Sequence, residues 1–222
     1  MINDTGNKDL RTGGERLPST LQIVIYAVIH CLIYLVTNRV CFVGDWHPLY
    51  CGLDESLPLV RWFVIPYCLW FAQIAGTLIW FLITDYDSLR RYMRYVMFST
   101  IPVYPVFILY PTCMPLRPSS LPGSDPLTLL LNFIYSVDNN TNIFPSLHVV
   151  WSVGSLLALW NDRLLSKPWA KAAAVFLTVM VCASTFMIKQ HSVMDVIGAV
   201  PFILSGWFFT YRQKNRETAI SE

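Results

Sequence analysis

Apolar stretches of near-spanning length alternate with polar segments along the 222-residue chain. A helix needs about 20 apolar residues to cross the hydrocarbon core of a bilayer. The pattern therefore predicts six membrane-spanning helices, at Thr20–Thr37, Arg61–Thr84, Tyr95–Pro111, Pro145–Asn161, Trp169–Ile188 and His191–Tyr211. The third stretch holds Pro102 and Pro105, so we expect this helix to be kinked.

The composition favours a membrane protein over a helical soluble protein. Hydrophobic residues make up 55% of the chain and charged residues only 14%, whereas a soluble domain carries about 25% charged residues. The first apolar stretch is longer than the roughly 7–15 residues of a signal-peptide core, so we interpret it as a retained helix. The net charge of +2 is too small to suggest nucleic-acid binding.

The distribution of basic residues predicts the orientation. With six spans, both termini lie on one side together with residues 85–94 and 161–171, and that side holds 12 of the 16 Lys and Arg residues. Such residues are retained on the cytoplasmic side. The predicted fold class is therefore all-α, a six-transmembrane-helix integral membrane bundle with both termini cytoplasmic. We expect a polar N-terminal segment (1–18), a six-helix membrane domain that carries the functional site (19–211) and a cytoplasmic tail (212–222).

Three loops remain on the outer side, at 38–60, 112–144 and 189–190. The second is longer than most connections without structure of their own, which is often a mark of function. Cys41 and Cys51 lie in the first loop, where a disulfide between them is one possibility in an oxidising exterior. No cysteine pair has the spacing of a zinc site and no acidic cluster suggests another metal, so we expect no metal and no cofactor.

Pro145-Ser146-Leu147-His148 opens the fourth predicted helix. Proline is favoured at the first helical position, and the N–H groups that follow it have no acceptor within the helix. If Pro145 holds that position, the amides of Ser146, Leu147 and His148 form an anion site at the positive end of the helix dipole. The alternative is a proline and serine that merely start a helix.

His191 and Asp195 lie four residues apart at the start of the sixth predicted helix, so they share one helical face. A carboxylate there would fix one tautomer of the imidazole and stabilise its cation. An ionisable residue in an apolar helix is costly and is usually functional. The alternative is a polar pair that helps helices to associate.

Four basic residues lie on the outer side: Arg39, Arg61, Arg117 and Lys189. Arg117 and Lys189 adjoin the histidine motifs in the predicted layout, and guanidinium and ammonium groups suit phosphate oxygens. Snorkelling at the membrane interface is the alternative. His30 lies in the middle of a predicted helix and is interpreted as a packing residue, and His47 receives no role.

Two histidines, a carboxylate, a helix start and two cations on one face are together typical of a phosphoryl-transfer site. One histidine can attack phosphorus and the other can protonate the leaving oxygen. Cations and amides can stabilise the charge on the equatorial oxygens. A transporter with a proton or anion relay is the alternative from another class, but no charged residue lines the inner half and no inverted repeat is visible.

These motifs resemble the membrane branch of the type 2 phosphatidic acid phosphatase superfamily, whose pattern is K-x6-R-P, then P-S-G-H, then S-R-x5-H-x3-D. The first motif remains as Arg117-Pro118, the second as Pro145–His148 and the third as Ser184-Thr185-x5-His191-x3-Asp195. The motifs cover roughly residues 110–195, and the six-helix topology extends the resemblance to the whole chain.

The chain departs from the family pattern at three positions. Tyr110 and Thr185 stand where the family has a phosphate-binding lysine and arginine, and Leu147 stands in place of a glycine. Lys189 is a candidate replacement for one of the lost cations. Leucine in place of the glycine of P-S-G-H is also found in branches similar to sphingomyelin and inositol-phosphoceramide synthases. Those branches transfer a headgroup phosphate to another alcohol.

The resemblance implies catalytic roles for His191 as nucleophile, Asp195 as the residue that orients it and His148 as general acid. It implies that Arg117, Ser146, Leu147 and Lys189 bind the substrate phosphate. We expect metal-independent hydrolysis of a membrane lipid phosphate through a phosphohistidine, at the outer face of the cell membrane. Headgroup transfer to an alcohol and a non-catalytic homologue that binds lipid phosphate are the alternatives.

Overall fold

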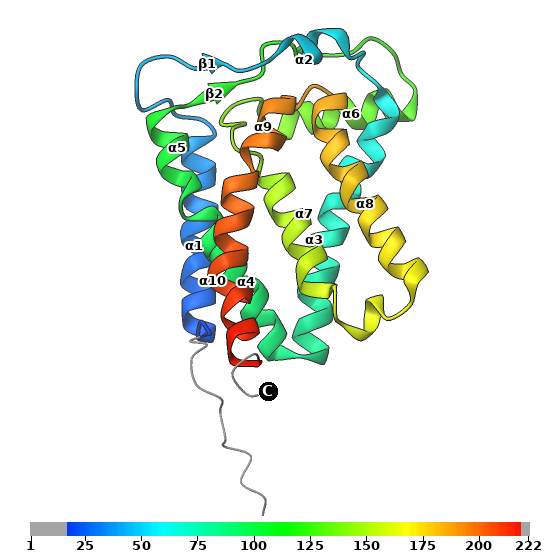
Figure 1. Ribbon diagram of the computed structural model, residues 1–222. Coiled ribbons are helices and arrows are strands. Elements are labelled where there is room, and N and C mark those ends of the chain that lie inside the picture. The colour runs from blue at the N-terminus through cyan, green and yellow to red at the C-terminus, as the bar shows by residue number, and fades with distance from the viewer. Residues whose placement is uncertain (1–16, 219–222) are drawn as a thin grey trace, which may run out of the picture.

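The computed structural model describes residues 17–218, which form a bundle of roughly parallel helices capped at one end by short elements (Figure 1). The bundle contains α1 (Thr20–Thr37), α3 (Val64–Thr84), α4 (Tyr86–Thr100), α5 (Val103–Leu109), α7 (Leu147–Leu159), α8 (Pro168–Met187) and α10 (Val200–Thr218). The upper end in Figure 1 carries α2 (Gly52–Ser56), α6 (Pro126–Val137), α9 (Val193–Gly198), β1 (His47–Pro48) and β2 (Thr112–Cys113). Two 3-10 turns, η1 (Arg61–Phe63) and η2 (Arg163–Leu165), complete the order.

Local sequence signals account for several helix starts. Ser19 caps α1 in a capping box with Gln22, which satisfies two amides that the helix itself leaves unpaired. The Asp85 side chain accepts hydrogen bonds from the amides of Asp87 and Ser88 at the start of α4. Pro168 occupies the first turn of α8, where its missing N–H costs nothing.

Five helical segments of the described chain are long and apolar enough to cross a membrane: Thr20–Thr37, Arg61–Thr84, Tyr86–Leu109, Pro168–Met187 and Val193–Arg212. The prediction of an all-helical membrane protein is thus confirmed in its class, whereas the count of six spans is not. Four predicted spans, at Thr20–Thr37, Arg61–Thr84, Trp169–Ile188 and His191–Tyr211, coincide with these segments to within two residues at most ends.

The predicted fourth span, Pro145–Asn161, contains only the 13-residue helix α7. At 1.5 Å per residue this helix is about 20 Å long, which is less than the roughly 30 Å of a bilayer core. The helices α3, α4, α8 and α10 all pack against α7, and seven of its residues are buried. A helix enclosed by protein need not match the lipid thickness, because its ends meet neighbouring chain instead of lipid.

The third predicted span begins nine residues earlier than expected. Residues 86–94, interpreted from the sequence as loop, form the first turns of α4 and are followed by the apolar part of the same helix. Charged and apolar residues alternate here with the helical period, so the charged side chains share one face. The expected kink is present, because α4 ends at Thr100 and α5 starts after Pro102.

Small residues let α4 approach its neighbours closely. A Cβ added at Gly154 of α7 would lie 2.2 Å from the ring of Tyr95, and one added at Gly206 of α10 would lie 1.9 Å from Ser99 Oγ. Tyr95 and Ser99 are both fully buried on α4. The contact between α4, α7 and α10 therefore depends on glycine at two positions.

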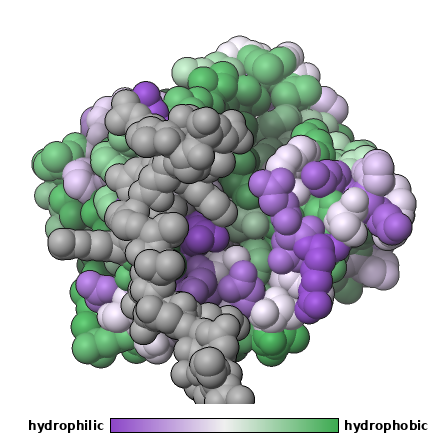
Figure 2. Space-filling view, turned by 60° about the horizontal axis from the view of Figure 1, so that its bottom comes forward, coloured by the Kyte–Doolittle hydropathy of each residue, from purple (hydrophilic) through white to green (hydrophobic). Residues whose placement is uncertain are grey.

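The sides of the bundle are apolar, and its lower end is more hydrophilic (Figure 2). Large side chains such as Leu82, Ile83, Trp169 and Phe176 are exposed on the helix flanks, as expected for surfaces that contact lipid. The first residues of α1 and the last residues of α10 lie at this lower end (Figure 1). The chain around η2 lies there too, and its Arg163 and Lys167 are exposed.

The loops at the upper end are joined to one another. The strands β1 and β2 pair in parallel, with His47 opposite Thr112. The long second loop is not structureless, because it contains the 12-residue helix α6.

Cys41 and Cys51 are free in this structure, so the disulfide considered from the sequence is not formed. The predicted N-terminal segment 1–18 falls almost wholly outside the described residues, and part of the predicted tail continues α10 as far as Thr218.

Candidate active site

A cavity of about 410 Å³ opens among the upper halves of the helices, and both His148 and His191 line it. Its other walls come from α1, α3, α5, α6 and α7 and from the segment between α6 and α7. On α3 the lining residues run from Tyr67 to Ile74, a rise of about 10 Å along the helix. The cavity therefore extends from the two histidines into the apolar part of the bundle.

His191 is held in one orientation by hydrogen bonds to a single ring nitrogen. Its Nδ1 lies 3.2 Å from Asp195 Oδ2 and 3.1 Å from the carbonyl oxygen of Ile143. Both neighbours are acceptors, so Nδ1 must carry the proton and donate. In the neutral ring Nε2 then keeps its lone pair, so it is the ring nitrogen that can act as a nucleophile. The two side chains meet as predicted, but they do not share a helical face, because His191 precedes Ser192, the N-cap of α9.

His148 faces that nucleophilic nitrogen. Its Nδ1 lies 3.1 Å from His191 Nε2, and the two rings meet edge to face. The His148 ring packs against Tyr67 and Trp70, with centroid separations of 4.8 and 4.5 Å. The Trp70 indole N–H also donates to the His148 carbonyl oxygen at 3.1 Å. These contacts fix the ring beside the position where a group attacked by His191 would sit.

The start of α7 differs in register from the prediction. Ser146 is the N-cap and the helix begins at Leu147, so Pro145 precedes the cap. The Ser146 amide is not free, because it donates to the main-chain oxygen of Asp195 at 3.2 Å. The Ser146 hydroxyl is buried and has no hydrogen-bond partner among the described residues. The amides of Leu147 and His148 remain first-turn donors, which have no acceptor within the helix.

Arg117 lies close to the histidines but is already bound to protein. Its Nη1 donates to Gln190 Oε1 and to the Asp138 carbonyl oxygen, both at 2.7 Å, and its guanidinium stacks on Tyr135. Gln190 precedes His191, so Arg117 supports the turn that presents the nucleophile. Arg117 does not line the cavity itself.

Lys189 points away from the histidines. Its Nζ donates to the carbonyl oxygens of Asp54 and of Leu57, the latter at 2.8 Å. The residue is buried, with a positive φ of 57° that turns the chain after α8. Lys189 is not among the residues that line the cavity. Its ammonium group instead connects the turn after α8 to the first outer loop through hydrogen bonds.

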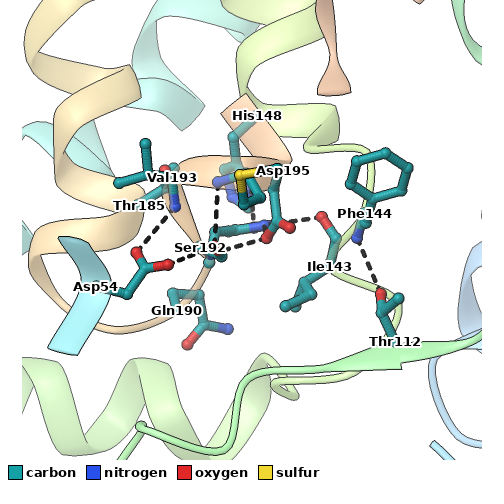
Figure 3. Close-up of polar contacts among 12 residues, drawn as sticks. Asp54, Thr112, Ile143, Phe144, His148, Thr185, Gln190, Ser192, Val193 and Asp195 are labelled. Carbon is teal, nitrogen blue, oxygen red and sulfur yellow. Dashed lines mark hydrogen bonds and ion pairs between the residues drawn. The ribbon is translucent and has the colours of Figure 1, made fainter. Parts of the chain in front are cut away.

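Sequence reasoning missed Asp54, a buried residue of the first outer loop. Its Oδ2 accepts a hydrogen bond from Ser192 Oγ at 2.5 Å, and its Oδ1 accepts one from the Val193 amide at 2.9 Å (Figure 3). Both donors directly follow His191. Asp54 and Lys189 thus connect the turn that contains His191 to the first outer loop. No motif or spacing marks Asp54 in the sequence.

The Asp54 carboxylate is kept ionised by these contacts. Burial opposes ionisation and would raise its pKa, but the hydrogen bonds from Ser192, Val193 and Cys51 more than offset this effect. The net result is a pKa below the usual value for aspartate, because each bond favours the charged form.

Asp138 is the second residue that the sequence did not reveal. It follows α6 and lines the cavity beside His148. Its carboxylate oxygens accept hydrogen bonds from Tyr34 at 3.2 Å and from Tyr67 at 2.5 Å. Tyr34 lies on α1, Tyr67 on α3 and Asp138 just after α6, so these three residues come together only in the folded chain.

The two positions at which the family cations are replaced have structural roles here. The carbonyl oxygen of Thr185 accepts the amides of Gln190 and His191 at 3.0 and 2.9 Å, so it closes the turn after α8. The Tyr110 ring stacks on His47 at 4.6 Å on the exposed upper surface. His30 contacts Tyr26 and Tyr104 inside the bundle, in line with a packing role, although it also lines the deep end of the cavity.

No group of three or more His, Cys, Asp and Glu side chains is placed to bind a metal ion within residues 17–218. The arrangement instead offers a nucleophilic nitrogen, an adjacent ring that can exchange a proton, and a helix start. This combination suits attack on phosphorus and protonation of the leaving oxygen.

Comparison with known proteins agrees with the motifs. The family model described as the PAP2 superfamily matches residues 39–209, which contain His148, His191 and Asp195. Neither the comparison with curated proteins nor that with solved structures gives a match. The chain therefore belongs to the PAP2 superfamily, whose members are generally phosphatases or phosphotransferases.

Proposed function

We propose that this protein transfers the phosphoryl group of a membrane lipid phosphate ester to water or to an alcohol through a phosphohistidine at His191. The observation that carries the proposal is the state of the His191 ring. Its Nδ1 is committed to Asp195 and Ile143, and its Nε2 faces His148 and the cavity.

The first step forms a bond between His191 Nε2 and phosphorus and breaks the ester P–O bond. The leaving oxygen takes the Nδ1 proton of a cationic His148, which becomes the neutral imidazole. The two rings are in direct contact, so they must separate to admit the phosphate. The Asp195 carboxylate stabilises the positive charge that develops on His191.

The second step reverses these roles. His148, now short of a proton, takes one from water or from an alcohol, whose oxygen attacks phosphorus. The P–N bond breaks, and His191 returns to its neutral form. The buried Ser146 hydroxyl and the first-turn amides of α7 are the proposed donors to the equatorial oxygens.

A lipid substrate fits the apolar walls. Phe71, Ile74 and Phe107 are among the apolar residues that line the cavity. The sides of the bundle are exposed hydrophobic surface, so an acyl or prenyl chain can remain in an apolar environment throughout the reaction. We place the site at the non-cytoplasmic face of the cell membrane, because the basic residues of the η2 region lie at the opposite end and such residues stay cytoplasmic.

Transfer to an alcohol is the variant of this reaction that the departures from the family pattern favour. No Lys or Arg is among the described residues that line the cavity, and the family's cation positions hold Tyr110 and Thr185. A phosphate monoester dianion would therefore meet little positive charge. A phosphodiester carries one negative charge fewer and is better matched to this lining.

The test uses purified full-length protein in detergent with EDTA and a panel of lipid phosphates and phosphodiesters, with and without alcohol acceptors. We expect turnover that His191→Ala and His148→Ala abolish, because loss of general acid–base help alone costs about 10²–10⁴-fold. His47→Ala is the matched control, since His47 lies outside the cavity on the same face. Equal turnover by the wild type and His191→Ala would contradict the proposal.

A further inference from the structure

The cavity contains a carboxylate that phosphate chemistry does not require. Asp138 lines the cavity, and its two oxygens are held by the hydroxyls of Tyr34 and Tyr67. A carboxylate can accept about four hydrogen bonds, so both oxygens keep capacity for a ligand. Because the carboxylate is fixed by donors from two helices, its position is part of the fold of the cavity.

Asp138 lies close to the reacting groups. The Tyr67 side chain connects the two places, since its ring packs on the His148 ring at 4.8 Å and its hydroxyl donates to Asp138 Oδ2. The carboxylate is thus one tyrosine side chain away from the proposed general acid. A group attached to the substrate phosphate by a short spacer would reach it.

The charge of the cavity lining is unusual for a phosphate site. Asp138 is acidic, and none of the described lining residues is Lys or Arg. Arg117 is occupied by Gln190 and the Asp138 carbonyl oxygen, and Lys189 by carbonyl oxygens of the first loop. Arg117 keeps its charge, because its acceptors are neutral, but it does not line the cavity. The charged group that a ligand in the cavity meets directly is the Asp138 carboxylate, which attracts a ligand that brings its own cation.

Aromatic rings complete the surroundings of the carboxylate. Tyr34, Tyr67 and Trp70 all line the cavity. Ammonium groups bind favourably over the faces of tryptophan and tyrosine, and quaternary ammonium ligands are recognised by such aromatic surroundings. A carboxylate beside aromatic rings is therefore a suitable site for an organic cation.

We propose that Asp138, Tyr67 and Trp70 form a subsite for the cationic amine of a phosphodiester headgroup, such as an ethanolamine or choline group, whose phosphate lies between His148 and His191. This inference rests on the proposed function and specifies its donor. Attack by His191 Nε2 then breaks the bond from phosphorus to the lipid oxygen, which takes a proton from His148. The headgroup phosphate stays on His191 until an acceptor oxygen displaces it.

Binding of short-chain lipids to the detergent-purified full chain tests the subsite. The probes are dihexanoyl phosphatidylcholine and its neutral isostere, in which a carbon atom replaces the choline nitrogen, with dihexanoyl phosphatidic acid as a third ligand. Measurement in the His191→Ala background separates binding from turnover. We expect the choline lipid to bind at least about fivefold more tightly than the isostere, the size that a partly desolvated cation over aromatic rings supplies.

The Asp138→Asn variant should lose most of this preference, because the amide keeps the shape and removes the charge. Asp45→Asn is the matched control, since Asp45 is an exposed carboxylate of the first outer loop, and it should keep the preference. Equal binding of the choline lipid and the isostere to protein with Asp138 intact would overturn the inference without any need for a variant. So would a preference that survives Asp138→Asn.

The outcomes also separate the inference from the proposed function. Turnover of phosphatidic acid that depends on His191, with no preference for the cationic lipid, would leave the proposed chemistry standing and remove the subsite. A preference for the cationic lipid without turnover of any substrate would establish the subsite and remove the catalytic proposal.

Discussion

At the scale of single residues, the site depends on which atoms of His191 are already in use. Asp195 is fully buried, and its Oδ2 accepts hydrogen bonds both from His191 Nδ1 and from the Ser192 amide at 2.8 Å. The carboxylate therefore sets the tautomer of the ring and anchors the helix that follows it. Asp195 therefore connects the start of α9 to the His191 ring.

Asp195→Asn should lower kcat strongly and change KM little. The amide removes the negative charge that stabilises a cationic His191 and can present its N–H₂ to Nδ1, which favours the wrong tautomer. In a histidine that is oriented in the same way, such a change lowers kcat by up to about 10⁴-fold. Steady-state kinetics on the lipid panel measure it, and a variant with wild-type kcat would show that Asp195 has only a structural role.

Asp54 should act as a positioning residue, because it touches the turn after His191 and not the cavity. Asp54→Asn should lower kcat about tenfold with KM unchanged and reduce stability by about 1–3 kcal/mol, the cost of weakened bonds to a buried charge. Glu55→Gln, an exposed neighbour on the same helix, is the control and should match the wild type. If the two variants lower kcat equally, or if Asp54→Asn changes only the melting temperature, the positioning role is wrong.

The contribution of Asp54 to stability depends on pH, because the pKa of its carboxyl group is lowered in the folded protein. A carboxyl whose pKa is lower in the folded protein contributes stability that is complete above its unfolded pKa, near 4, and lost as the pH falls through the folded value. The difference in stability between the wild type and Asp54→Asn should therefore be constant at neutral pH and shrink only in acid.

At the scale of elements, α7 is a short helix surrounded by longer ones. The sequence predicted a spanning helix here because residues 145–161 are apolar, yet many of these side chains face protein. Hydropathy cannot distinguish contact with lipid from contact with other helices. The same ambiguity explains why the charged start of α4 was interpreted as loop, since its apolar residues face the core.

Gly154→Ala should destabilise the bundle, because the new Cβ would lie 2.2 Å from the buried Tyr95 ring. Overpacking of this kind typically costs about 1–3 kcal/mol. Gly76→Ala on α3 is the matched control, since nothing lies within 4 Å of its Cβ position, and it should leave stability unchanged or raise it by about 0.5–1 kcal/mol through helix propensity. Melting temperatures in detergent decide between these outcomes. Equal melting of the two variants would contradict the close packing of α4 on α7.

Part of the candidate site could be predicted from the sequence, because His191 and Asp195 are close together along the chain. Only four positions separate His191 from Asp195 in the sequence, and His148 lies in the first turn of α7, so both placements depend on short-range sequence. Asp54 and Asp138 were missed because their contacts join segments 71 to 138 residues apart, which periodicity does not encode. The prediction for Lys189 considered only its place beside His191, whereas the turn with positive φ directs its ammonium to the first loop.

At the scale of the whole molecule, the proposed site and the basic loop at η2 lie at opposite ends of the bundle. This separation predicts accessibility from opposite sides of the membrane. A cysteine introduced at exposed Ser120 in the second loop should react in intact cells with a membrane-impermeant thiol reagent, above the background of the parent chain. A cysteine at exposed Ser166 should react only after the membrane is opened. The reverse pattern would place the site on the cytoplasmic face.

The most direct test of the central claim is to look for the covalent intermediate. The full-length protein is mixed with substrate, quenched in base after milliseconds, and digested for mass spectrometry at alkaline pH, where a phosphorus–nitrogen bond survives. We predict a phosphate or headgroup-phosphate adduct on His191 that forms and decays at rates compatible with kcat and is absent from His191→Ala. Turnover with no adduct on His191, or with an adduct on another residue, would contradict the account.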